Sequence, residues 1–121
     1  MPAKRRITVQ SGKAKGRNLQ KWVRDRLIDL LGVHPEDVES RSMGAAGEDI
    51  IMSRACREKF PFSVECKNVE KINVWDCYKQ AATNCPEGAE PLLVFKKNNQ
   101  KAKVMLDADY FIAMQAKINK D

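Results

Sequence analysis

The chain has little of the residues that usually build a zinc site. Among its 121 residues there is one histidine, His34, which lies beside Pro35 and is interpreted as a loop residue. The four cysteines show no CxxC spacing, so we expect no zinc site. We interpret them as reduced core residues of an intracellular protein; they are Cys56, Cys66, Cys77 and Cys85.

Long hydrophobic runs are also lacking. No apolar stretch is long enough to span a bilayer, and the basic start of the sequence, Met1 to Arg6, lacks the apolar region of a signal peptide. The sequence therefore predicts a protein that is neither secreted nor inserted in a membrane. It has no repeats and no low-complexity tracts, and its length fits one domain with a proper core.

Acidic residues are scarce at the beginning of the chain. Residues 1–26 contain nine Lys and Arg but one acid, which gives +8 there and leaves −2 for the rest of a chain of net charge +6. Gly, Ser and scattered Lys predict a flexible basic arm over residues 1–16, before a folded domain over residues 17–121. Such an arm suits phosphate backbones, although a solubilising tail has the same composition. The cations expected to bind DNA are Lys4, Arg5, Arg6, Lys13, Lys15, Arg17, Lys21 and Arg24.

Hydrophobic periodicity predicts a single α/β domain. Helices are expected over residues 17–31 and 73–85 and after Asp107, and strands over residues 37–41, 50–52, 62–67, 91–97 and 102–106. The order α-β-β-β-α-β-β-α corresponds to a mixed sheet of about five strands flanked by helices. The apolar residues expected to face inward include Trp75 and Tyr78 in the second helix and Phe111, Ile112 and Ile118 in the last. The alternative for Trp75 and Tyr78 is stacking on bases.

Two carboxylates and a lysine are expected to meet at this sheet. In the strand over residues 62–67, Glu65 and Lys67 share one face, and Asp49 opens the strand before it. Such a group can hold Mg²⁺ beside a cation that positions water, which suits hydrolysis of a phosphodiester. The alternatives are a surface ion pair between Glu65 and Lys67 and an ordinary turn acid at Asp49. Glu48 is expected to be solvated, and it replaces Asp49 if the strand register is shifted by one.

The chain resembles the PD-(D/E)xK nuclease superfamily over roughly residues 16–112. The one (Asp/Glu)-x-Lys in the chain, Glu65-Cys66-Lys67, is separated from Asp49 by fifteen residues and is followed by a helix that carries Gln80. Within the superfamily, the chain looks most like small phage-encoded nucleases and archaeal-type Holliday-junction resolvases. Two positions depart from the pattern: Glu48 stands where the name-giving proline is found, and Gln20 stands where related resolvases often carry a first-helix glutamate.

The resemblance implies a restriction-endonuclease-like core and a metal-dependent endodeoxyribonuclease. Asp49, Glu65, Lys67 and Gln80 would be catalytic, and Mg²⁺, with Mn²⁺ as a substitute, would be held by Asp49, Glu65 and the carbonyl of Cys66. Gln20 would be a further site residue, and Ser40 or Ser42 would contact a phosphate.

The implied substrate is branched or junction DNA. Two symmetric cuts imply a homodimer, the place of action is the cytoplasm of a bacterial host, and no small-molecule cofactor is expected. A site-specific, homing-type endonuclease and a catalytically silent DNA-binding module are the alternatives.

Overall fold

The computed structural model describes residues 9–41 and 47–120. In this part of the chain the predicted α/β order is confirmed. The connection over residues 54–61, expected to be irregular or briefly helical, contains a short helix. The elements are α1 (Val9–Leu31), the 3₁₀ helix η1 (Pro35–Asp37), β1 (Val38–Ser40), β2 (Ile50–Met52), α2 (Arg54–Lys59), β3 (Phe62–Asn68), α3 (Val74–Thr83), β4 (Glu90–Lys96), β5 (Lys103–Met105) and α4 (Ala108–Asn119).

The five strands form two sheets. β1 and β2 pair antiparallel, with Val38 opposite Met52. The second sheet has the order β3-β4-β5 and is mixed, because β3 and β4 run parallel while β4 and β5 run antiparallel. A parallel pair needs a crossover between its strands, and α3 provides it. β4 is the central strand, as its apolar sequence predicts, and Leu93 at its middle is fully buried.

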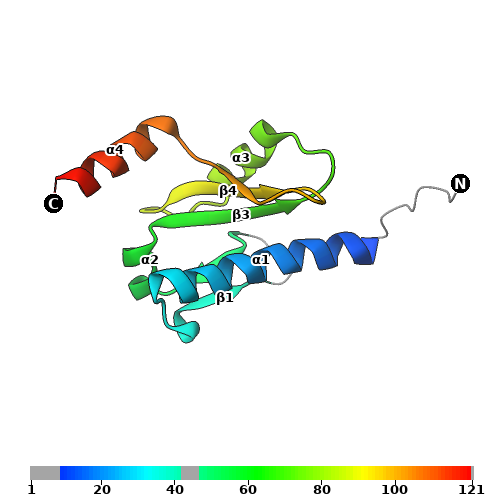
Figure 1. The fold of residues 1–121 in the computed structure, drawn as a ribbon, viewed down its shortest axis with the longest axis horizontal. Coiled ribbons are helices and arrows are strands. Elements are labelled where there is room, and N and C mark those ends of the chain that lie inside the picture. The colour runs from blue at the N-terminus through cyan, green and yellow to red at the C-terminus, as the bar shows by residue number, and fades with distance from the viewer. Residues whose placement is uncertain (1–8, 42–46, 121) are drawn as a thin grey trace, which may run out of the picture.

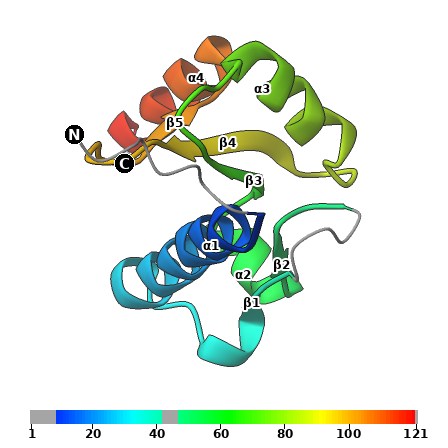
Figure 2. The same cartoon turned by 90° about the vertical axis from the view of Figure 1, so that its right-hand side faces the viewer.

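Helices lie on both sides of the three-stranded sheet. Figure 1 shows α1 running along β3, and Figure 2 shows α1 with β1, β2 and α2 on one side and α3 on the other. Leu19, Val23 and Leu27 of α1 recur at helical spacing and pack in one core with Phe62 and Val64 of β3. No helix of the described residues is long and apolar enough to cross a membrane.

The first helix begins earlier than the sequence predicts. α1 starts at Val9 rather than Arg17, so residues 9–16 of the expected arm belong to it. Apolar periodicity does not predict a helix over residues 9–16, because polar residues occupy most of these turns and Gly lowers helix propensity. The predicted end is correct: Gly32 has a φ of +67°, which favours glycine, and its N–H donates to the carbonyl of Ile28 at 3.1 Å.

Two predictions of inward-facing residues are wrong. Trp75 is 73 % exposed, because α3 packs against β3 and β4 through a face centred on the buried Ala81. In α4, Tyr110 and Met114 contact the core, whereas Phe111, Ile112 and Ile118 are exposed. Figure 1 shows the reason, since α4 extends away from the end of the sheet.

Candidate active site

Asp49 lies immediately before β2, where the two sheets meet. Its N–H donates to the carbonyl of Val64 on β3 at 2.9 Å, and its own carbonyl accepts a bond of 2.8 Å from the N–H of Arg41. Its carboxylate accepts a hydrogen bond of 2.6 Å from the N–H of Cys66. These three bonds fix Asp49 at the edge of β3 that β4 does not occupy.

β3 supplies the other two residues of the predicted site. Phe62, Val64 and Cys66 alternate toward the core, which turns Glu65 and Lys67 to the opposite face. Glu65 is buried, and its Oε1 lies 3.8 Å from the Nζ of Lys67, whose side chain is 31 % exposed. The pair is therefore not the surface ion pair of the alternative interpretation, because its acidic member is out of solvent.

Both carboxyl groups have a raised pKa. Desolvation by burial is the largest cause for Glu65, and the charge of Asp49 adds to it, so the pKa rises to about 7 against the opposing effects of Lys67 and a side-chain hydrogen bond from Asn84. Burial also raises the pKa of Asp49, although the Cys66 N–H and nearby cations oppose it. The charged forms of two such carboxyl groups are unfavourable side by side, and a cation that both of them bind stabilises these charged forms.

The arrangement fits a divalent cation that prefers oxygen ligands. Oε2 of Glu65 is buried and has no hydrogen-bond partner among the described residues. The N–H and carbonyl of one strand residue point to the same edge, so the N–H bond from Cys66 to Asp49 orients the Cys66 carbonyl toward Asp49 as well. Across the described ranges no three His, Cys, Asp or Glu side chains gather. Two carboxylates, one carbonyl and several waters would therefore complete a Mg²⁺ site.

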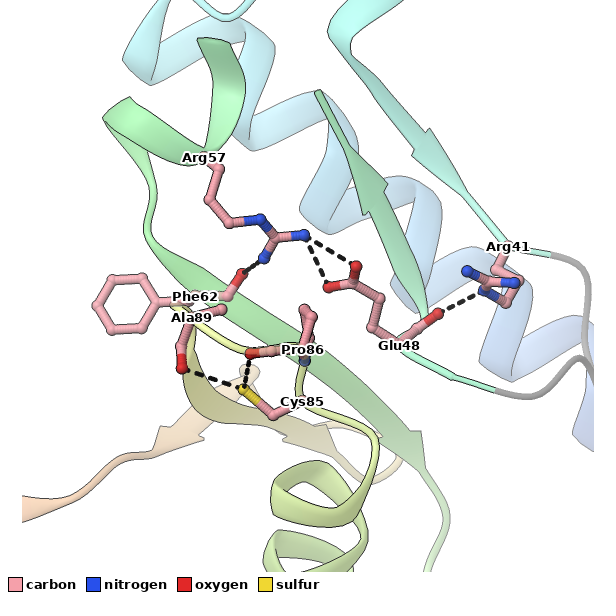
Figure 3. Close-up of polar contacts among 7 residues, drawn as sticks. All are labelled: Arg41, Glu48, Arg57, Phe62, Cys85, Pro86 and Ala89. Atoms are coloured by element: carbon pink, nitrogen blue, oxygen red, sulfur yellow. Dashed lines mark hydrogen bonds and ion pairs between the residues drawn. The ribbon is translucent and has the colours of Figure 1, made fainter. Parts of the chain in front are cut away.

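Glu48 is held by an ion pair, as Figure 3 shows. Nη2 of Arg57 lies 2.8 and 3.1 Å from the two carboxylate oxygens, and Nη1 donates to the carbonyl of Phe62 at 3.0 Å. Nε of Arg41 donates to the carbonyl of Glu48 at 2.7 Å. The expectation that Glu48 is solvated is therefore wrong, because α2 places Arg57 next to it. With its carboxylate engaged by Arg57, Glu48 does not replace Asp49.

Figure 3 also shows how the turn after α3 is closed. The thiol of Cys85 contacts the carbonyls of Pro86 and Ala89 at 3.4 and 3.2 Å. All four cysteines are free, as predicted, and Cys56 and Cys66 are buried. None of them is paired with another, which agrees with their interpretation as reduced residues.

The predicted Gln80 is exposed on α3. In this region Asn84 lowers the pKa of Glu65, and the pKa of Cys77 is raised by Glu65 and lowered by Lys67, so both residues lie near the site. With the buried Ala81 they have i, i+4, i+7 spacing, the signal by which the sequence indicates one helix face. Gln80 lies at the margin of this face, three residues after Cys77, and its contact with substrate stays a prediction.

Gln20 is 3 % exposed on α1, between Leu19 and Val23 on the face that packs against β3. A neutral amide side chain tolerates burial better than a charged glutamate does. The substitution relative to the resolvase pattern thus agrees with its surroundings. Its role at the site remains a prediction.

The residues predicted to bind DNA fall into three groups. Lys13, Arg17 and Lys21 are exposed and form one stripe on α1, because they are spaced by four residues. Two others have partners within the chain: Lys15 lies 3.7 Å from Glu70, and Arg24 donates to the carbonyls of Val38 and Pro35. Lys4, Arg5, Arg6 and Ser42 lie outside the described residues.

Comparison with known proteins identifies the family of the chain. The family model described as "Phage putative PDDEXK endonuclease" matches residues 11–121, which is most of the chain. A search of curated proteins and a search of solved structures each gave no match.

Proposed function

Because the chain belongs to this family of phage PD-(D/E)xK endonucleases, we propose that it is a divalent-metal-dependent nuclease that cuts branched or junction DNA. The observation that carries the proposal is the pairing of Asp49 with Glu65 beside Lys67. Two desolvated carboxylates are unfavourable without a cation, since burial raises the pKa of both and the charge of Asp49 raises that of Glu65 further. A site of this kind is explained by a bound cation, and PD-(D/E)xK nucleases typically use a divalent metal.

The division of roles follows from burial. Asp49, Glu65 and the carbonyl of Cys66 would hold Mg²⁺, with Mn²⁺ as a substitute. When bound, the cation polarises the scissile phosphate and lowers the pKa of a coordinated water. Lys67 reaches solvent from the same face of β3, so its ammonium can orient the attacking water and stabilise the charge that develops on the phosphate.

Junction cutting implies two copies of the chain. A four-way junction has two equivalent strands to cut, so a C₂ homodimer presents one site to each. The exposed Phe111, Ile112 and Ile118 of α4 support this part of the proposal, since a monomer rarely leaves several large apolar side chains of one short helix in water. The mass of the protein in solution, measured by light scattering with and without junction DNA, tests it: a monomer in both conditions contradicts the dimer.

The function itself is tested by incubating the protein with a mobile four-way junction, a linear duplex and a single strand. Each substrate is given Mg²⁺, Mn²⁺ or EDTA, and the wild type is compared with Glu65→Ala. We expect metal-dependent cutting that Glu65→Ala lacks, with paired nicks at the junction. The matched control is Glu58→Ala, which removes an exposed carboxylate from α2 and should cut like the wild type.

The other results identify the alternatives. Cutting of a linear duplex at one sequence, with no preference for the junction, indicates a site-specific homing-type enzyme. Binding without cutting under both metals indicates a silent DNA-binding module. In that case the role given to Asp49, Glu65 and Lys67 is wrong.

A further inference from the structure

A cleft of about 770 Å³ lies between α1 and the turn that joins β4 to β5. The wall on α1 includes Trp22 and Arg26, and the opposite wall includes Lys96 and Lys101. Asn68, at the end of β3, also lines the cleft. The volume falls in the range of pockets that hold small-molecule ligands, which is the size of a nucleotide rather than of a duplex.

The side chains that line the cleft are of the types that bind a nucleic-acid strand. Arg26, Lys96 and Lys101 supply three positive charges, and no acidic side chain is among the lining residues. The amides of Asn18, Asn68, Asn99 and Gln100 add donors and acceptors of the kind that hydrogen-bond base edges. A cationic groove with amides and an aromatic ring is the combination that binds single strands.

Trp22 is the aromatic residue of this cleft and is 45 % exposed, although it belongs to a helix whose other face is core. The guanidinium of Arg26 lies over its ring, 5.4 Å from the centre, which places a cation against the indole. The indole is therefore incompletely buried, and its exposed part is a surface on which a base can stack.

The cleft begins one residue beyond the candidate active site. Lys67 and Asn68 are consecutive on β3, and side chains alternate along a strand, so Lys67 faces the site while Asn68 faces the cleft. The amide of Asn68 donates to the carbonyl of Lys15 at 3.1 Å, which connects this end of β3 to the basic half of α1. A strand held at the site can therefore continue around the end of β3 into the cleft.

We propose that this cleft binds unpaired nucleotides of the substrate, with a base stacked on Trp22 and its phosphates near Arg26, Lys96 and Lys101. The identification of the ligand as DNA rests on the proposed nuclease function. Bases inside a duplex are stacked on each other, so the ring of Trp22 is available only to a base that has left the duplex. The substrate would thus carry unpaired nucleotides next to the cut, either in a flap or an open fork or where bases are unpaired at the branch point of a junction.

The chain offers a direct optical test because it has two tryptophans, of which Trp75 is exposed on α3 and lies outside the cleft. Trp75→Phe leaves Trp22 as the one tryptophan, and Trp22→Phe leaves Trp75. Each variant is titrated in EDTA with a short oligodeoxythymidylate and with a blunt duplex. We expect saturable quenching of Trp22 by the single strand, weaker quenching by the duplex, and no quenching of Trp75.

Affinity gives the second measurement. Trp22→Ala should weaken binding of a labelled single strand at least about five-fold, since stacking of one base contributes roughly 1–3 kcal/mol. Trp75→Ala should leave that affinity within about two-fold, and Lys101→Ala should lower the salt slope by about 0.7, the value for one phosphate of a single strand. Thermal unfolding of each variant establishes that it is folded.

The outcomes separate this inference from the proposed function. Metal-dependent cutting by Trp75→Phe with no change in Trp22 emission, or an oligonucleotide affinity that Trp22→Ala leaves unchanged, overturns the cleft and leaves the nuclease intact. Quenching of Trp22 in a protein that cuts no DNA under any divalent metal supports the cleft and overturns the nuclease. Failure to bind single strands at all overturns the cleft.

Discussion

Substitution of Lys67 tests, at a single residue, the proposed chemistry of phosphodiester hydrolysis. The ammonium of Lys67 lies 3.8 Å from Glu65, is partly open to solvent, and has the reach to act on a water or a phosphate oxygen at the site. We expect Lys67→Ala to lower the rate of cutting by about 100-fold or more, the usual effect of losing one electrostatic stabiliser of a transition state. Binding of uncut DNA in EDTA should change only a few-fold, because one cation among many is lost.

The matched control is Lys71→Ala, which removes an exposed lysine from the loop that follows β3. It should retain full cutting. If Lys67→Ala weakens binding as much as cutting, measured by gel shift and by initial rates, Lys67 is a contact to the DNA backbone and the role given to it is wrong.

Glu65 gives a prediction about stability that needs no substrate. Its pKa rises from 4.5 to about 7 in the folded protein. Between these values the folded state keeps a proton that the unfolded state has lost, so the free energy of unfolding falls as pH rises, and the full penalty is present above about pH 7. Glu65→Gln removes the titrating group while keeping the shape of the side chain. In EDTA it should therefore be more stable than the wild type at high pH.

Thermal unfolding in EDTA measures this difference. At about pH 8 we expect Glu65→Gln to unfold about 3 °C or more above the wild type, which corresponds to roughly 1 kcal/mol for a domain of this size. The two proteins should converge toward pH 5, where the wild-type carboxyl is protonated. Glu58→Gln, at an exposed site, should show no such divergence, and a less stable Glu65→Gln at high pH contradicts the burial argument.

At the scale of elements, the pairing of α2 with the segment before β2 has a structural consequence. Glu48 occupies the place where the family pattern has a rigid proline, and Arg57 of α2 holds its carboxylate with two short contacts. We infer that this pair restrains the backbone that carries Asp49. Arg57→Ala should lower the free energy of unfolding by about 1–3 kcal/mol, because it leaves the largely buried Glu48 without its partner.

Urea denaturation measures that loss, and Arg54→Ala, at an exposed position of the same helix, is the control and should change stability little. The double variant Glu48→Gln with Arg57→Ala should be less destabilised than the sum of the single variants, since the unpaired charge is removed. If the effects add, the two side chains are not coupled.

The elements that could be predicted from the sequence are those whose pattern is local. Alternation identified β3 and with it Glu65 and Lys67. Asn73 and Asp107, whose side chains favour helix N-caps, stand at the starts of α3 and α4. The orientation of α4 could not be predicted, because apolar residues occur on all of its faces. The sequence alone does not indicate which face packs against the sheet. Glu48 was missed for the same reason: its partner comes from another element.

At the scale of the whole molecule, the division into two sheets lay beyond sequence reasoning. Which strands pair depends on contacts between distant segments, and periodicity carries no information about them. Asp49 nonetheless lies beside Glu65, because its N–H donates to the carbonyl of Val64 and its carboxylate accepts from the N–H of Cys66, which joins the small sheet to β3. The sequence placed Asp49, Glu65 and Lys67 near one another, as the structure does, while the bonds that bring them together are visible only in the fold. Their catalytic role stays a prediction.

Charge is distributed unevenly over the molecule, and this uneven distribution favours DNA binding at one part of the surface. The stripe of Lys13, Arg17 and Lys21 occupies the first half of α1, and the same stripe continues as Asp25 and Asp29 in the second half. The basic half lies near the end of β3, as the contact between Lys15 and Asn68 shows. DNA bound to this stripe therefore extends toward the candidate site and away from the acidic half of the helix.

Lys4, Arg5 and Arg6 precede α1 and add three cations to its basic end. Because the helix begins at Val9, a deletion that tests these cations must stop before it: removing residues 1–15 would also remove the first two turns of α1 and the pairing of Lys15 with Glu70. Deletion of residues 2–8 should weaken binding to duplex DNA. The slope of log K against log salt concentration should become shallower by up to about 2.7, since each phosphate contact contributes about 0.9.

A triple variant, Lys4→Gln, Arg5→Gln and Arg6→Gln, keeps the length of the chain and separates charge from chain length. If the cations neutralise phosphates, the triple variant should reproduce the shallower slope of the deletion, while both proteins retain the melting temperature of the wild type. Fluorescence anisotropy of a labelled duplex in EDTA, measured over a series of salt concentrations, gives the slopes. A slope that the deletion changes and the triple variant does not would assign the effect to the chain rather than to its charge, because counterion release depends only on the number of phosphates neutralised.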